Sequence, residues 1–192
     1  MINPEINVAA TSLAPTYNTA AEFPHIVFND FVNKTILDDV AREAKFLVNE
    51  EDAETSEWRM GSKQWNDMID HNDQVFKRGI RDLEKMPYYM NLLCRYFNSD
   101  EFMEFMRQLT GIEDLSPDWG LEGGGFHVTY PGGLLNIHHD FNYKDDIAPV
   151  RMYRKVNLLI YLNEEWEDDW QGALELWKSD LTEDFKTLQP KY

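Results

Sequence analysis

The sequence changes its periodicity at Gly111, and this change constrains the fold more than any other feature. Before Gly111, apolar residues recur at helical spacing, as Ile36, Val40 and Ala44 do in "TILDDVAREAKFLV". After it, short apolar runs such as "GGGFHVTY", "LLNIHHDFN" and "KVNLLIYLN" are separated by turn residues, which is typical of strands. Helices followed by strands predict an α+β fold, in which helices pack on one face of an antiparallel sheet.

The individual elements follow from the same patterns. We expect helices over residues 35–48, 75–86, 88–97 and 98–112, and a first strand over residues 25–28. Asn98 is the expected N-cap of the last helix and Gly111 its C-terminal stop. Residues 1–20 are small and polar and predict a flexible tail, so that residues 21–192 form the folded domain.

Length and charge exclude several classes of function. The 192 residues suggest one domain, and the net charge of −17 disfavours binding to nucleic acid or to anionic membranes. The single cysteine, Cys94, excludes an internal disulfide, and its apolar neighbours predict a buried packing role. The N-terminus has no signal-peptide pattern and the longest apolar run is too short to span a membrane, so we expect a cytoplasmic protein.

The stretch "KVNLLIYLN" would present two different faces as a strand. One face is aliphatic and is expected to pack on the helices; it consists of Val156, Leu158, Ile160 and Leu162. The other face is mixed and consists of Lys155, Asn157, Leu159, Tyr161 and Asn163. A mixed face is compatible with a strand that lines a ligand pocket and equally with a strand that has one face in water.

The stretch "NIHHDFN" combines two histidines with an aspartate. In a strand, His138 and Asp140 would share one face and His139 would point to the other. One imidazole and one carboxylate make up two of the three ligands in a 2-His-1-carboxylate iron site. The same pattern also suits polar residues on a solvated strand.

The order and spacing of several motifs resemble the iron(II)- and 2-oxoglutarate-dependent dioxygenases, in particular their prolyl 4-hydroxylase-like branch. These motifs are "TYPGG", "NIHHD", "RKVNLLIYLNEEW" and "GALELW", and the resemblance covers roughly residues 24–192. It implies a double-stranded β-helix (jelly-roll) sheet, with Fe(II), the small-molecule cosubstrate 2-oxoglutarate, and ascorbate as a further cofactor. The implied reaction is hydroxylation of a protein, peptide or small-molecule substrate, coupled to oxidative decarboxylation of 2-oxoglutarate.

The resemblance also implies roles for individual residues. His138 and Asp140 match the metal ligands, and Tyr130 and Tyr161 match tyrosines at the cosubstrate. Asn157 and Leu159 share the face of Tyr161 and would line the same cosubstrate pocket. His127, at the mouth of a strand, is expected beside the metal ligands or in a structural role, and Arg154 is expected beside the metal ligands.

The sequence departs from the family pattern at two places. Gln171-Gly172 stands where the family has a Gly-Gly turn. No histidine follows His139, and the sequence ends at "LQPKY", where the family continues with a distal histidine and then an arginine or lysine. We therefore expect a sheet that lacks its last strands and binds iron and 2-oxoglutarate weakly. The alternatives to a working oxygenase are a truncated or split inactive domain, completed by a separate chain, and an interaction module on the same scaffold.

Overall fold

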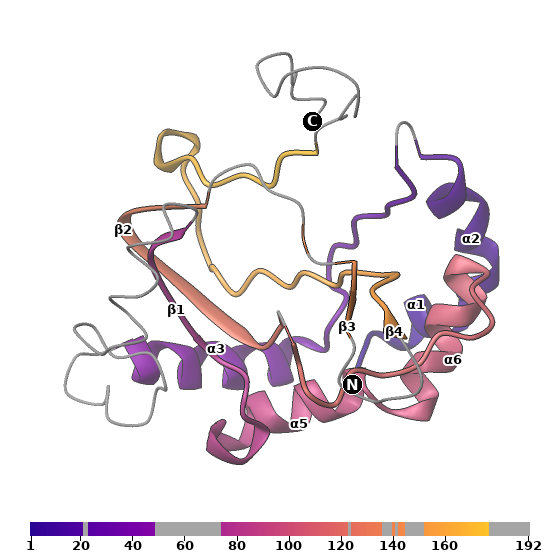
Figure 1. Ribbon diagram of the computed structural model, residues 1–192, viewed down its shortest axis with the longest axis horizontal. Helices are drawn as coiled ribbons and strands as arrows, with labels where there is room; N and C mark the ends of the chain where they lie inside the picture. Colours follow the sequence, from indigo (N-terminus) through magenta and orange to yellow (C-terminus); the bar gives the residue numbers. More distant parts are fainter. Residues whose placement is uncertain are drawn as a thin grey trace.

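The computed structural model describes residues 1–20, 23–48, 74–122, 124–135, 140, 142–144 and 152–176 (Figure 1). The helices are α1 (Pro4–Val8), α2 (Ala10–Asn18), α3 (Lys34–Val48), α5 (Tyr88–Phe97) and α6 (Asp100–Thr110), with short 3-10 turns η2 (Leu83–Lys85) and η3 (Asp168–Trp170). The strands are β1 (Gln74–Ile80), β2 (Phe126–Leu135), β3 (Tyr143–Lys144) and β4 (Met152–Tyr153). None of the described helices combines the length and the apolar character that a membrane span requires.

The described strands form two separate antiparallel pairs. β1 pairs with β2, from Gln74 opposite Leu135 to Ile80 opposite Phe126, with an irregular register after Val75. β3 pairs with β4, with Tyr143 opposite Tyr153. Helices combined with small antiparallel sheets are compatible with an α+β fold, whereas the jelly-roll sheet stays a prediction.

The predicted helix over residues 75–86 is wrong, because most of this stretch forms β1 and the turn η2. The backbone of β1 instead pairs along β2, and Gly79 lies opposite His127. Glycine is a poor helix former, so the local preference for a helix was weak enough for this pairing to override it.

Residues 4–18, which the sequence predicts as part of a flexible tail, form α1 and α2. Ile2 and Ala10 are buried, and α2 packs along α6, as the right side of Figure 1 shows. Residues 25–28 do not form the expected strand; the nearby pairing is a single bridge between Ile2 and Val32. Ile6, Ala10, Leu13 and Tyr17 recur at helical spacing, which is the pattern that the polar composition obscured.

Two clusters of buried residues form the core of the part of the chain that the structure describes. The first, here called the α3–α5 cluster, consists of Val32, Val40, Ala44, Ile80, Met86, Met90 and Leu93. The second, here called the α6 cluster, consists of Ile2, Ala10, Phe102, Met103, Phe105, Met106 and Leu109. Both clusters draw mainly on the helices that the sequence predicts over residues 35–48, 88–97 and 98–112, and these three helices are confirmed.

Residues 154–163 cross the molecule from β4 and cover both clusters (Figure 1). Val156 packs against the α6 cluster, and Ile160 and Leu162 pack against the α3–α5 cluster. The predicted packing of the aliphatic face on the helices is therefore confirmed for these three residues, whereas Leu158 remains 38% exposed. The segment has no assigned strand, although its alternation of partly buried and exposed residues is that of an extended chain.

The N-cap of α6 differs by one residue from the predicted one. Ser99, not Asn98, is the N-cap of α6, and its hydroxyl accepts a hydrogen bond from Phe102 N at 3.3 Å. Asn98 instead follows α5 and donates to the Cys94 carbonyl at 3.0 Å. Gly111 ends α6 with φ of 75°, as predicted. Cys94 packs against the α3–α5 cluster, and burial raises the pKa of its thiol to about 11.

A first prediction concerns the chain as it enters β2. Gly125 has φ of +102°, and a Cβ there would collide with the Ile80 carbonyl oxygen. Gly125→Ala should lower the free energy of unfolding by at least about 1–2 kcal/mol, because an L-residue at positive φ is strained before the collision is added. Gly124→Ala is the matched control, since its Cβ would meet Leu121 at an ordinary 3.5 Å. Equal losses in urea denaturation of the two variants would contradict this geometry.

Candidate functional site

The β3–β4 pair brings together Asp140 and Arg154, two of the residues that the sequence analysis singled out. Arg154 N donates to the Asn142 carbonyl at 3.0 Å, which extends the register of the pair by one residue. In that register Arg154 lies opposite Asn142, two residues after Asp140. Their side chains meet, with 3.3 Å between Arg154 Nη2 and Asp140 Oδ2.

The environment of this ion pair leaves the carboxylate accessible. The Arg154 side chain is 19% exposed, whereas that of Asp140 is 47% exposed. A carboxylate has two oxygens and can accept several partners at once, so contact with an arginine is compatible with metal binding. Carboxylate oxygen and imidazole nitrogen are also the donors of 2-His-1-carboxylate iron sites, and the chemistry of Asp140 fits that metal.

The two adjacent histidines, His138 and His139, lie outside the described residues. The prediction that His138 shares a face with Asp140 is therefore untested and stays a prediction. Among the described residues no group of three or more His, Cys, Asp or Glu side chains is placed to hold a metal ion.

Strand β2 carries Tyr130 and His127 on opposite faces. Residues 126, 128 and 130 are partly buried and residues 127, 129 and 131 are exposed. Phe126 packs against the α3–α5 cluster, so Tyr130 lies on the inward face of the strand. His127 lies on the outward face, opposite Gly79 of β1.

The remaining predicted cosubstrate residues lie on the segment that crosses the core. Asn157, Leu159 and Tyr161 are all exposed and alternate with the aliphatic residues that face the helices. Their side chains therefore project away from the core, as a ligand-contacting face requires. The structure places Tyr130 and Tyr161 on different elements, and their convergence on one cavity stays a prediction.

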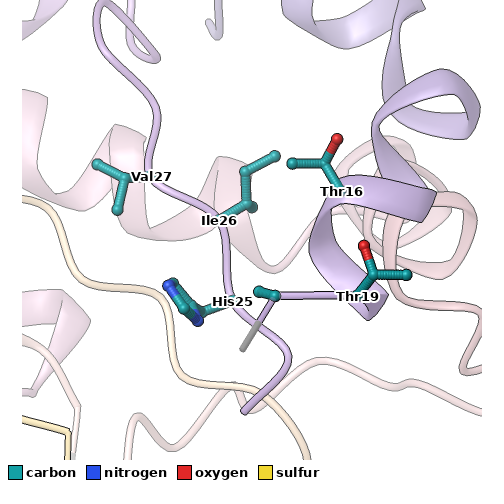
Figure 2. A pocket seen from close by; sticks show the side chains of 6 residues that line it. Thr16, Thr19, His25, Ile26 and Val27 are labelled. Carbon is teal, nitrogen blue, oxygen red and sulfur yellow. The ribbon is translucent and has the colours of Figure 1, made fainter. Parts of the chain in front are cut away.

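A pocket that the sequence analysis did not predict lies at the N-terminal end of the molecule (Figure 2). It is lined by Thr16, Thr19, Ala20, His25, Ile26 and Val27. The ring nitrogen Nδ1 of His25 is 2.9 Å from the Phe23 carbonyl oxygen. None of the predicted site residues lines this pocket, and its threonines and aliphatic side chains form no pattern that would have revealed it in the sequence.

The comparison with protein families agrees with the resemblance of the motifs. Residues 107–192 match the family described as the 2OG-Fe(II) oxygenase superfamily. The matched range begins in α6 and contains Tyr130, His138, Asp140 and Tyr161. The match is a likeness of this segment to a superfamily that is named for Fe(II) and 2-oxoglutarate, and it agrees with the motifs at Tyr130, His138, Asp140 and Tyr161. Comparison with curated proteins and with solved structures finds no significant match.

Proposed function

We propose that the protein is an iron(II)- and 2-oxoglutarate-dependent dioxygenase of the prolyl 4-hydroxylase-like branch. Its substrate in this proposal is a protein, with a prolyl residue as the first candidate, or a small molecule. The observation that carries the proposal is the His138-x-Asp140 pair within the matched range, with Asp140 accessible beside Arg154.

His138 and Asp140 are the proposed protein ligands of the metal. Their donor types suit Fe(II), and a spacing of two residues on one extended chain lets both approach it from the same side. When bound, iron and 2-oxoglutarate supply the oxidative chemistry, in which the cosubstrate is decarboxylated and the substrate hydroxylated. Ascorbate belongs to the proposal as a reductant.

Arg154 is the proposed positioning residue for Asp140. Its guanidinium lies 3.3 Å from the carboxylate, and Arg154 is the more buried residue of the pair. The arginine therefore limits the orientations that the Asp140 carboxylate can adopt. A charged hydrogen-bond partner beside a ligand orients it and tunes the site. Tyr130, Tyr161, Asn157 and Leu159 are the proposed contacts for 2-oxoglutarate, and His127 is a proposed neighbour of the metal ligands.

The proposal is tested by following 2-oxoglutarate turnover. The 192-residue chain is incubated with Fe(II), oxygen, ascorbate and 2-oxoglutarate, in buffer with and without imidazole as an added nitrogen ligand. With imidazole present, succinate should form faster than with free iron, and Arg154→Ala should slow this reaction while Arg154→Lys partly restores it. A rate that is independent of the protein would contradict the oxygenase and favour a second candidate.

That second candidate is a non-catalytic domain on the same scaffold, truncated or split, or serving as an interaction module. The observation that favours it is the ion pair with Arg154, which competes with a metal for the Asp140 carboxylate. The two candidates differ in whether iron binds at Asp140. The oxygenase requires that it does, whereas the non-catalytic domain keeps the Asp140–Arg154 ion pair without iron.

A further prediction concerns the cosubstrate. Tyr161→Phe removes one hydroxyl from the exposed face of residues 154–163 and should raise the KM for 2-oxoglutarate about 2- to 10-fold, the value of one hydrogen bond. The maximal rate should change much less, because the hydroxyl is proposed to bind the cosubstrate and not the reacting atoms. Tyr153→Phe is the matched control, since Tyr153 is equally exposed but packs against Tyr143 on the β3–β4 ribbon.

A further inference from the structure

Two tryptophans build a compact loop between residues 164 and 172. Trp166 Nε1 donates to the Gln171 carbonyl at 2.8 Å, and its ring lies against Gly172, where an added Cβ would be 3.2 Å from Cζ2. Trp170, at the end of η3, meets the Trp166 ring edge-on, with 5.6 Å between ring centroids and 82° between ring planes. The loop therefore holds Trp166 in a defined orientation.

Both indoles nevertheless remain open to solvent. Trp166 is 54% exposed and Trp170 is 55% exposed. Tryptophan is highly buried on average and is enriched at interfaces. Two neighbouring exposed tryptophans are therefore more typical of a binding surface than of an ordinary loop. These two indoles, with the acidic side chains around them, are here called the Trp166–Trp170 surface.

The charged residues of the loop itself, residues 164–172, are all acidic. The carboxylates of the loop belong to Glu164, Glu165, Glu167, Asp168 and Asp169, and every one of these residues is exposed. Glu164 is bound to Lys45 of α3 at 2.8 Å, which anchors the loop to the helical layer. Within the part of the chain that the structure describes, the other four have no ion-pair partner.

We propose that the Trp166–Trp170 surface docks a segment of a partner protein that is rich in arginine or lysine. The faces of indole rings attract cations, arginine most often, and the unpaired carboxylates attract the same cations at longer range. Charge complementarity favours this occupant, because the four carboxylates of the loop without an ion-pair partner attract cations and disfavour acidic peptides and nucleic acids. The proposal does not depend on iron or 2-oxoglutarate and therefore stands or fails separately from the proposed oxygenase.

The test measures the affinity of the full 192-residue chain for the peptide acetyl-Gly-Arg-Arg-Arg-Arg-Gly-amide by calorimetry at low salt. Trp170→Ala should weaken binding about two- to five-fold, the range of an exposed cation–π contact. Glu165→Gln combined with Glu167→Gln should weaken it to a similar extent, since two exposed charge contacts are lost. Within the described residues, neither glutamate side chain makes a hydrogen bond or an ion pair, so this double variant should unfold at the same temperature as the parent.

Two matched controls separate this surface from general attraction to an acidic protein. Trp119 is 52% exposed but lies outside the loop, and Trp119→Ala should leave the affinity unchanged. Glu113→Gln combined with Asp114→Asn removes the same two charges from another exposed site and should also leave it unchanged. The proposal is overturned if the parent chain does not bind the peptide, if Trp170→Ala binds as tightly as the parent, or if the two double variants lose affinity equally.

Discussion

Phe102→Ala is expected to lower the free energy of unfolding by about 3–5 kcal/mol, the usual cost of removing a buried phenylalanine ring. Phe102 is 2% exposed and lies at the centre of the α6 cluster. Its ring is 4.8 Å from that of Phe97 and 5.7 Å from those of Tyr96 and Phe105, measured between centroids. The cavity would be bounded by three aromatic rings from α5 and α6, which cannot collapse without moving both helices.

Urea denaturation of the parent and the variant measures this loss. Glu104→Ala is the matched control on the same helix, because Glu104 is exposed and its substitution should change stability by no more than about 0.5 kcal/mol. A loss below about 1 kcal/mol for Phe102→Ala would contradict the place of the α6 cluster in the core.

His138→Ala and Asp140→Ala should each weaken iron binding by more than about 100-fold, since changes to residues behind the metal ligands already cost 10- to 100-fold. Neither change should unfold the domain, because the Asp140 side chain is half exposed and its ion pair is partly screened by solvent. Ile160→Asp provides the opposite control: it places a carboxylate against the α3–α5 cluster and should unfold the protein. Equal losses of stability in Ile160→Asp and His138→Ala would contradict this division between core and site.

The sequence predicted secondary structure and burial correctly where apolar residues recur at one regular spacing over a whole element. The helices α3, α5 and α6 each carry an apolar stripe, and these stripes form most of the core. The alternation in residues 154–163 likewise predicted that Val156, Ile160 and Leu162 face the helices. In both cases the periodic pattern consists of the apolar side chains that become buried on folding, so the pattern predicts which face is buried.

The errors occurred where distant contacts determine the structure. β1 has local features of a helix, but its backbone hydrogen bonds go to β2, about fifty residues later in the chain. α1 and α2 look polar in sequence, because only one narrow stripe, which includes Ala10 and Leu13, meets the α6 cluster. Neither partner is visible from the local sequence.

The candidate site shows the same division. The period of two in a strand predicts which residues of that strand could share a face, but it does not predict a contact such as that of Asp140 with Arg154. The contact itself depends on the register between the two strands, which the local pattern does not encode. The family motifs identified the residue types, whereas the pairing of Asp140 with Arg154 required the structure.

The central claim, that His138 and Asp140 hold iron together with 2-oxoglutarate, is tested most directly by an anaerobic titration. Fe(II) and 2-oxoglutarate are added to the 192-residue chain in the presence of imidazole, and the metal-to-ligand charge-transfer band is recorded. A saturable band should appear with the parent chain and with His127→Ala, and it should be lost in His138→Ala and in Asp140→Ala. A band that survives in the last two variants, or that disappears in His127→Ala alone, would contradict the assignment of the ligands.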